Sequence, residues 1–246
     1  MAGHVKVWDE GPVRVVALDR PEKGNAIDRA TAEALQAAMR EFDRSDSRVA
    51  VLTGTGTKAF SVGADLGDPP ELWRAVPNVG WRTDKPLIAA VEGWCVGGAL
   101  VLAMMADLAV CGAGARFHYP EAKIGLTGGM IAALPSRIPH KIAMELMLLC
   151  RTFEAERAAA VGLVNEVVPE GEALARAVEW GREMAGFAPM VMGALKRMVV
   201  DDILPRGPSE AWALQGERLA AIRESEDFAE GVAAFREKRE PVFRGR

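Results

Sequence analysis

Two glycine-rich loops and one glutamate carry the chemistry that this sequence offers. The first loop, residues 59–66, reads AFSVGADL, and the second, residues 93–98, reads GWCVGG and leads into a helical pattern. Glycine lets a backbone N–H face a ligand closely, and a helix N-terminus adds a dipole that favours negative charge. Two such N–H groups from different loops would form an oxyanion hole, whereas either loop taken alone is typical of a packing turn.

Other motifs in the sequence fit their usual chemistry poorly. Residues 54–59 (GTGTKA) follow an apolar run, but a dinucleotide-binding loop also needs a helix at its third position and a suitably placed acid. The residues that follow contain another glycine and no helical period. Ser61 lacks the Gly-x-Ser-x-Gly frame of a hydrolase, and the three histidines lack the spacing of metal ligands. We expect His118 to be a hydrogen-bonded residue at the end of a strand, with a role in the site as the alternative.

Composition excludes further classes of function. The 246 residues are 50% hydrophobic and 26% charged, and the net charge of −4 gives no basic field for nucleic acid. The three cysteines are widely spaced in apolar runs, which predicts buried thiols rather than zinc ligands. No segment has the length of a membrane span or the pattern of a signal peptide. We therefore expect a cytoplasmic protein with neither a nucleic-acid partner nor a membrane partner.

Apolar periodicity predicts the elements that would hold the two loops. The expected strands cover residues 5–8, 13–18, 49–52, 87–91, 108–111 and 164–168. The expected helices cover residues 28–43, 98–105, 172–187, 190–200, 210–223 and 227–240. Strands that alternate with helices indicate a parallel α/β core. We expect one folding unit, with a core over 1–190 and a helical extension over 191–246 that caps the core or packs against another subunit.

Six short segments occur in an order that resembles one family. They are Arg20-Pro21-x-x-x-Asn25-Ala26, Gly63-Ala64-Asp65-Leu66, 85–91 (KPLIAAV), Gly97-Gly98, 120–125 (PEAKIG) and 162–164 (GLV). Together they resemble the crotonase, or enoyl-CoA hydratase/isomerase, superfamily over essentially the whole chain. Residues 225–227, 237–239 and 241–243 are similar to the carnitinyl-CoA dehydratase and hydratase branches. The resemblance implies an α/β fold, the ClpP-like crotonase spiral of ββα turns, with a helical C-terminal trimerisation region.

The same resemblance implies an acyl-CoA thioester as ligand, with no metal and no cofactor beyond the coenzyme A of the substrate. The thioester oxygen would lie between the backbone N–H groups of Ala64 and Gly98, and Glu121 matches the carboxylate that transfers protons. The residues implied around coenzyme A are Val62, Asp65 and Leu66 at the adenine, Lys23 at the phosphates, and Phe235 and Lys238 on a C-terminal helix, often a neighbour's. The implied assembly is a homotrimer or a dimer of trimers.

The sequence departs from the family pattern at a position that matters for chemistry. Hydratases of this family use two glutamates, and the first follows the second glycine loop by one helical turn. That position is Val101 here, in the acyl pocket, and valine can neither orient water nor donate a proton. The segments 65–85 and 126–135 are shorter than usual, which predicts a pocket of unusual shape. Asp65 and Glu92 are the nearby acids that could replace the missing glutamate.

An oxyanion hole with one base is sufficient for enoyl-CoA isomerisation. Polarising the thioester carbonyl stabilises an enolate, and a carboxylate whose pKa is raised by apolar surroundings can carry a proton between C4 and C2. We expect this isomerisation, within fatty-acid-type metabolism, with Glu121 as the base and Val101 as a wall that excludes water. Three alternatives stay open: a hydratase or dehydratase that uses Glu121 with an unidentified second acid, other thioester chemistry, and a non-catalytic acyl-CoA-binding protein.

Overall fold

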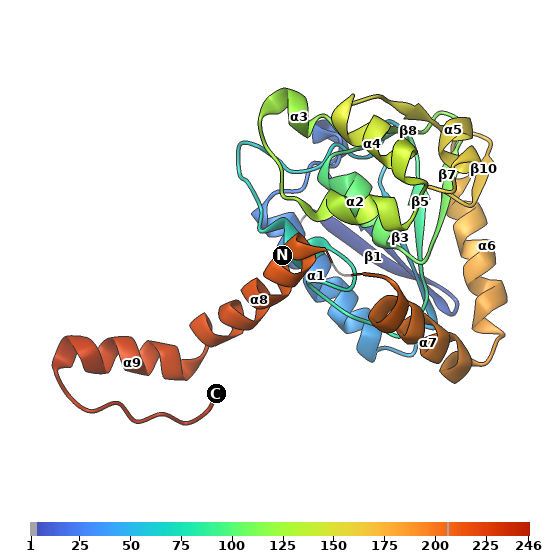
Figure 1. Cartoon of the computed structure of the whole chain (residues 1–246). Coiled ribbons are helices and arrows are strands. Elements are labelled where there is room, and N and C mark those ends of the chain that lie inside the picture. Colours follow the sequence, from blue (N-terminus) through green and yellow to red (C-terminus); the bar gives the residue numbers. More distant parts are fainter. Residues whose placement is uncertain (1–3, 206) are drawn as a thin grey trace.

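A hairpin at the start of the chain begins a six-stranded sheet (Figure 1). The computed structural model describes residues 4–205 and 207–246. The first two strands are antiparallel, and each later strand joins its neighbour in parallel. In spatial order the sheet contains β1 (Val5–Glu10), β2 (Val13–Leu18), β3 (Val49–Gly54), β5 (Leu87–Val91), β7 (Leu108–Gly112) and β10 (Glu166–Val168).

Helices cover both faces of this sheet. α1 (Arg29–Arg44) begins after Asp28, whose side chain accepts the Thr31 N–H at 2.8 Å as a helix N-cap. Its apolar stripe packs on one face, whereas α6 (Ala173–Ala185) covers the opposite face, toward which alternate side chains such as Val51 point. Burial on both sides explains why β3 and β5 are continuous apolar runs rather than alternating ones.

A second, smaller sheet is formed by short strands that alternate along the chain with strands of the first sheet. Its order is β4 (Ala59–Ser61), β6 (Trp94–Val96), β8 (Arg116–His118) and β9 (Phe153–Glu154), of which the first three are parallel. Each of β3, β5 and β7 is followed along the chain by one of these short strands. β6 and β8 then lead into α2 (Gly98–Met105) and α3 (Glu121–Ile124). This repetition of strand, strand and helix is the spiral of ββα turns that the family resemblance implies.

The remaining elements are helical. They are η1 (Pro21–Lys23), η2 (Leu72–Ala75), η3 (Met130–Ser136), η4 (Met198–Ile203), α4 (His140–Leu148), α5 (Ala155–Ala160), α7 (Pro189–Arg197), α8 (Pro208–Arg223) and α9 (Glu226–Glu237). Lys196 and Arg197 tie α7 to the core through ion pairs with Asp107 at 2.7 Å and Asp84 at 2.6 Å. α7 spans residue 190, where we expect the core to end, and that division of the chain stays a prediction.

α8 packs on the core near η2, where Ala213 is buried and Glu224 lies 3.3 Å from Arg74, and α9 projects beyond it; together they form an arm, defined as residues 208–246 (Figure 1). Large apolar side chains on this arm are exposed, among them Trp212 at 74% and Phe235 at 86%. Isolated exposed apolar residues are ordinary, but a projecting helix pair that carries many of them is typical of a surface that another chain covers.

The expected strands and helices are present, with small differences at their ends, as in β10, which is shorter than the predicted 164–168. The short strands β4, β6, β8 and β9 were not predicted, and β4 and β6 lie inside the two glycine loops. The three cysteines are free and buried, as expected. His118 ends β8, and its Nδ1 lies 3.3 Å from the Thr152 hydroxyl, which confirms the expectation of a hydrogen-bonded strand end.

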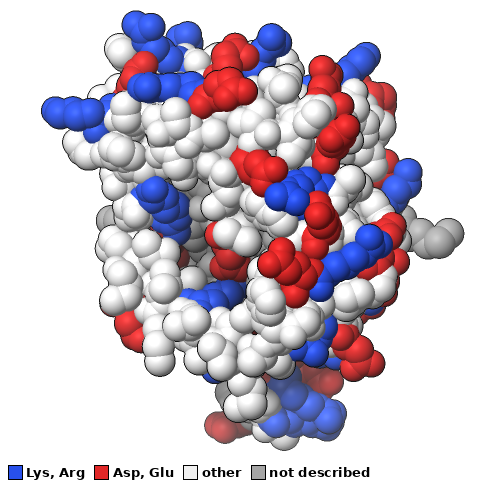
Figure 2. All heavy atoms as spheres, turned by 90° about the vertical axis from the view of Figure 1, so that its right-hand side faces the viewer, with Lys and Arg blue, Asp and Glu red and all other residues white. Residues whose placement is uncertain are grey.

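The described surface carries charges of both signs. On the face that includes α6, Lys and Arg side chains alternate with Asp and Glu side chains, and no extended basic area lies on that face (Figure 2). Within residues 4–205 and 207–246, none of the helices combines the length and the apolar character needed to cross a membrane.

Candidate active site

Three parallel strands of the small sheet end at one edge, and each is followed by a residue of the predicted site. β4 leads to Ala64, β6 leads to Gly98, and β8 leads to Glu121. β6 and β8 run in register from Trp94 opposite Arg116, and the Gly97 N–H donates to the His118 carbonyl at 2.9 Å. Carboxyl ends of parallel strands form the usual place for a ligand crevice, so the sheet brings the two loops and the glutamate together.

The two glycine loops touch each other, which leaves no room for larger residues. A Cβ added to Gly63 would lie 2.6 Å from the Val96 carbonyl oxygen and 3.1 Å from the Gly98 nitrogen, and Gly63 has a φ of +87°. Gly98 is the first residue of α2, so its N–H has no intrahelical acceptor. Neither the Ala64 nor the Gly98 amide has a hydrogen-bond acceptor among the described residues. These two N–H groups are therefore free to bind an oxygen atom.

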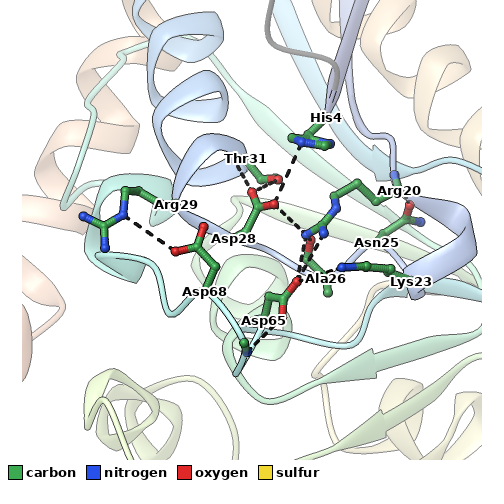
Figure 3. A network of polar contacts seen from close by, with 11 residues as sticks. His4, Arg20, Lys23, Asn25, Ala26, Asp28, Arg29, Thr31, Asp65 and Asp68 are labelled. Carbon is green, nitrogen blue, oxygen red and sulfur yellow. Dashed lines mark hydrogen bonds and ion pairs between the residues drawn. The ribbon is translucent and has the colours of Figure 1, made fainter.

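Arg20 anchors the first loop through Asp65 (Figure 3). Its guanidinium is buried, lies 2.9 Å from Asp28 Oδ2 and donates to Asp65 Oδ2 at 3.2 Å. The backbone continues this link, because the Asp65 N–H donates to the Ile27 carbonyl and the Ile27 N–H donates to the Gly63 carbonyl, both at 2.8 Å. Ala64 is thus held on both sides, and its N–H direction is fixed.

Glu121 is held next to the second loop. A Cβ added to Gly97 would lie 2.8 Å from Glu121 Oε1, so the carboxylate packs directly on the loop backbone at the start of α2. Its other oxygen, Oε2, is buried and has no hydrogen-bond partner in the described part of the chain. Burial raises the pKa of Glu121 to about 7, because no charge nearby compensates the lost hydration. A carboxyl with this pKa can both accept and return a proton near neutral pH.

The start of α2 is surrounded by apolar groups. Val101 lies one turn along α2 from Gly98 and is 3% exposed, within an eight-residue helix that is buried throughout. Leu72 of η2 covers Gly98, since a Cβ built there would lie 2.5 Å from Leu72 Cδ2. An aliphatic side chain, Leu72, therefore lies at the start of a helix whose residues are all buried and apolar, which offers little polar surface to hold water.

The two acids nominated as replacements for the missing glutamate are engaged elsewhere. Asp65 binds Arg20 and accepts the Gly67 N–H at 3.0 Å, and these contacts hold the pKa of Asp65 below its usual range. Glu92 Oε1 accepts the Ala173 N–H at 2.9 Å, at the start of α6. Within the described residues, no group of three or more His, Cys, Asp or Glu side chains could hold a metal ion.

The residues predicted around coenzyme A fall into two groups. Val62, Asp65 and Leu66 belong to the first loop, and Lys23 lies beside it: Lys23 Nζ is 3.8 Å from Asp65 Oδ2, and the Val62 N–H donates to the Gly24 carbonyl. The Val62, Leu66 and Lys23 side chains are exposed, as ligand contacts would be. Phe235 and Lys238 lie instead on the arm, at α9, away from this group within one chain (Figure 1).

Three features of the site were not predicted. Arg20 appears in the sequence only as part of a motif, and its two acidic partners, Asp28 and Asp65, lie 8 and 45 residues away along the chain, by residue number. Leu72 lies in a segment noted only for its length, and no local pattern points to its contact with Gly98. The hydrogen bond between Tyr119 and Thr127 also has no sequence signal beyond the position of Tyr119, the one tyrosine of the sequence, directly before Pro120-Glu121.

Comparisons with known proteins agree with this arrangement. A sequence model of the family described as enoyl-CoA hydratase/isomerase matches residues 9–246. Carnitinyl-CoA dehydratase from Salmonella typhimurium is 37% identical over 268 residues, with both chains covered completely. The alignment is longer than the 246 residues of this chain, so it contains gaps.

Solved structures show the same relationship. Carnitinyl-CoA hydratase from Mycobacterium avium has a TM-score of 0.78 and 33% identity, with 99% of each chain covered. Enoyl-CoA hydratase from Mycobacterium tuberculosis H37Rv has a TM-score of 0.76 and 33% identity, with 99% of this chain and 100% of that chain covered. The fold is therefore the crotonase fold, and this chain belongs to the enoyl-CoA hydratase/isomerase family.

Proposed function

We propose that the chain is an enoyl-CoA isomerase that moves the double bond of a 3-enoyl-CoA into conjugation with the thioester. One observation carries this proposal: the edge of the small sheet offers two free N–H groups and one half-buried carboxylate, Glu121, with Val101 where a second carboxylate would be needed for ordinary hydration. An isomerisation needs a base and an oxyanion hole, and it needs no activated water.

The proposed reaction has two proton transfers. The thioester oxygen accepts hydrogen bonds from the Ala64 and Gly98 N–H groups, which stabilises the negative charge of an enolate. The Glu121 carboxylate removes a proton from C2, and the electron pair of that C–H bond is delocalised over the dienolate. The Glu121 carboxyl then returns the proton to C4, the double bond comes to lie between C2 and C3, and the carboxylate is regenerated.

The aliphatic side chains of Val101 and Leu72 favour isomerisation over hydration. A water molecule at C3 would divert the conjugated product toward a 3-hydroxyacyl-CoA. Aliphatic side chains offer such a molecule no hydrogen bond, so hydration is disfavoured at the site where the product forms. The near-neutral pKa of Glu121 suits a group that must be a base in the first step and an acid in the second.

Dehydration or hydration of an acyl-CoA is the second candidate. It is favoured by the names of relatives, because a carnitinyl-CoA dehydratase is 37% identical over its whole length. This function would need a second proton-transfer group, and Asp65 and Glu92 are bound to Arg20 and to the start of α6 instead. A non-catalytic acyl-CoA-binding protein is the third reading, since the N–H pair would bind a thioester without turnover.

The coenzyme A portion is proposed to bind across two chains. Lys23, Val62, Asp65 and Leu66 would contact the nucleotide from the body of one subunit. Phe235 and Lys238 project on the arm, so they would complete the nucleotide site of a neighbour in a homotrimer or a dimer of trimers. The exposed apolar residues of the arm would be covered in such an assembly.

Product identification separates these functions. Purified protein is offered 3-enoyl-CoA and 2-enoyl-CoA thioesters of several chain lengths, and the products are identified by mass spectrometry, with Glu121→Gln as control. We expect conversion of the 3-enoyl substrates and loss of that conversion in the variant. Formation of a 3-hydroxyacyl product from 2-enoyl substrates alone would overturn the isomerase proposal, and tight binding without turnover would favour the binding protein.

A further inference from the structure

The turn that carries Glu121 is closed by one side-chain hydrogen bond. The Tyr119 hydroxyl lies 2.9 Å from Thr127 Oγ1, and either oxygen could donate. Tyr119 is 6% exposed, so its hydroxyl needs a partner within the protein. Thr127 Oγ1 also accepts the Gly129 N–H at 3.0 Å, directly before the buried Met130 that begins η3. The contact therefore joins the two ends of the segment 119–127 to each other and to the core.

The segment between these two residues has little else to hold it. α3 contains four residues, and a helix this short is not stable by itself. Residues 122–128 are exposed, so packing contributes little to their order. The backbone bonds of the segment are local, such as Lys123 N–H to the Pro120 carbonyl and Leu126 N–H to the Glu121 carbonyl.

Glu121 itself has no side-chain partner that could orient it. Its Oε2 is buried without a hydrogen bond in the described residues, and its Oε1 packs against the backbone at Gly97. The direction of the carboxylate thus depends on where the backbone of its turn is placed. A shift of about 1 Å in a reacting group can cost roughly a hundredfold in rate.

We propose that the hydrogen bond between Tyr119 and Thr127 positions Glu121 against the second glycine loop. Tyr119 and Thr127 are then positioning residues for the proton transfer. This inference rests on the proposed role of Glu121 as the base. Burial also raises the pKa of Tyr119 to about 12, so the hydroxyl stays protonated over the pH range of an assay. The bond is therefore present whether Glu121 is charged or neutral.

Two single variants and their combination test this inference. Tyr119→Phe and Thr127→Val each remove the bond and keep most of the side-chain volume. We expect each to lower kcat about tenfold with KM within about twofold. The double variant should be no worse than Thr127→Val, which also loses the Gly129 N–H bond, because the bond between Tyr119 and Thr127 is already absent there. Thr152→Val, which removes the contact with His118 outside the site, is the matched control and should leave kcat unchanged.

Hydrogen–deuterium exchange supplies a readout that does not depend on activity. Backbone amides of residues 121–128 should exchange faster in Tyr119→Phe and Thr127→Val than in the wild type or in Thr152→Val. Unchanged exchange there, or losses of kcat that multiply in the double variant, would overturn the inference. If Tyr119→Phe keeps the wild-type kcat while Glu121→Gln is inactive, the positioning role of Tyr119 is refuted and the proposed function stands. If Glu121→Gln is active, the proposed function is refuted as well.

Discussion

Burial of the Glu121 carboxyl should lower the free energy of unfolding at high pH, and glutamine at this position should remove that loss of stability. Burial raises the pKa of Glu121 to about 7, from an ordinary value of 4.5. Between these two values the folded chain keeps a proton that the unfolded chain has lost. The free energy of unfolding therefore falls as the pH rises from about 4.5 to about 7, and this contribution is constant above that range.

The size of the effect follows from the shift. The difference between the pKa of Glu121 in the folded chain and its ordinary value corresponds to about 3 kcal/mol of unfolding free energy, at roughly 1.4 kcal/mol for each pKa unit. Partial exposure of the side chain reduces this energy to about 1–2 kcal/mol. Glu121→Gln has nearly the same shape and is neutral at every pH. Its free energy of unfolding should nearly equal that of the wild type at about pH 4.5 and exceed it by about 1–2 kcal/mol above about pH 8. The corresponding rise in Tm is about 3–6 °C.

Urea unfolding of both proteins at the two pH values measures this difference. The protein concentration must be the same throughout, because the stability of an oligomer depends on it. Thermal unfolding on the same samples gives the shift in Tm. If the two proteins differ by the same amount at both pH values, or if the wild type gains stability relative to the variant as the pH rises, the argument that Glu121 is held in a desolvated site is refuted.

Three further predictions test the roles of Val101, of Arg20 and of the arm. Val101→Glu should raise the formation of 3-hydroxyacyl-CoA from 2-enoyl-CoA about tenfold or more, because it supplies a second carboxylate, and a product assay that finds no increase would contradict the role of Val101. Arg20→Met should lower the free energy of unfolding by about 3 kcal/mol in a urea titration, because it leaves Asp28 and Asp65 without their buried partner. Arg29 is exposed, so the control variant Arg29→Met should change the free energy of unfolding by less than about 0.5 kcal/mol in the same titration. Phe235→Asp should reduce the mass of the assembly measured by light scattering, and an unchanged mass would show that this face of the arm is not an interface.

Regular elements of the fold could be predicted because their patterns are long enough to read. The helix behind Asp28 has a clear apolar stripe over sixteen residues, and the hairpin of β1 and β2 is set by a Gly-Pro turn. The strands β4, β6 and β8 contain three residues each, which is too short for alternation to be visible. Their sequences therefore predict loops, although the parallel pairing of these strands is what brings the site together.

Residue types in the site could be predicted, whereas their contacts could not. Glycine at 63 and 97 indicated close backbone approach, and the structure gives the reason, since side chains there would collide with Val96 and Glu121. The partner of each glycine lies 24 or more residues away along the chain, so sequence spacing carries no information about it. The same holds for Arg20 and Asp65, whose contact depends on the path of the whole first turn of the spiral.

The central claim is that Glu121 alone carries a proton from C2 to C4 without adding water. The most direct measurement is turnover of a 3-enoyl-CoA in heavy water, with deuterium at C4 of the 2-enoyl-CoA product counted by mass spectrometry. If Glu121 alone transfers the proton, part of the product carries the original C2 hydrogen at C4, and no 3-hydroxyacyl-CoA forms. Complete solvent deuterium at C4 together with a 3-hydroxyacyl product would contradict the claim.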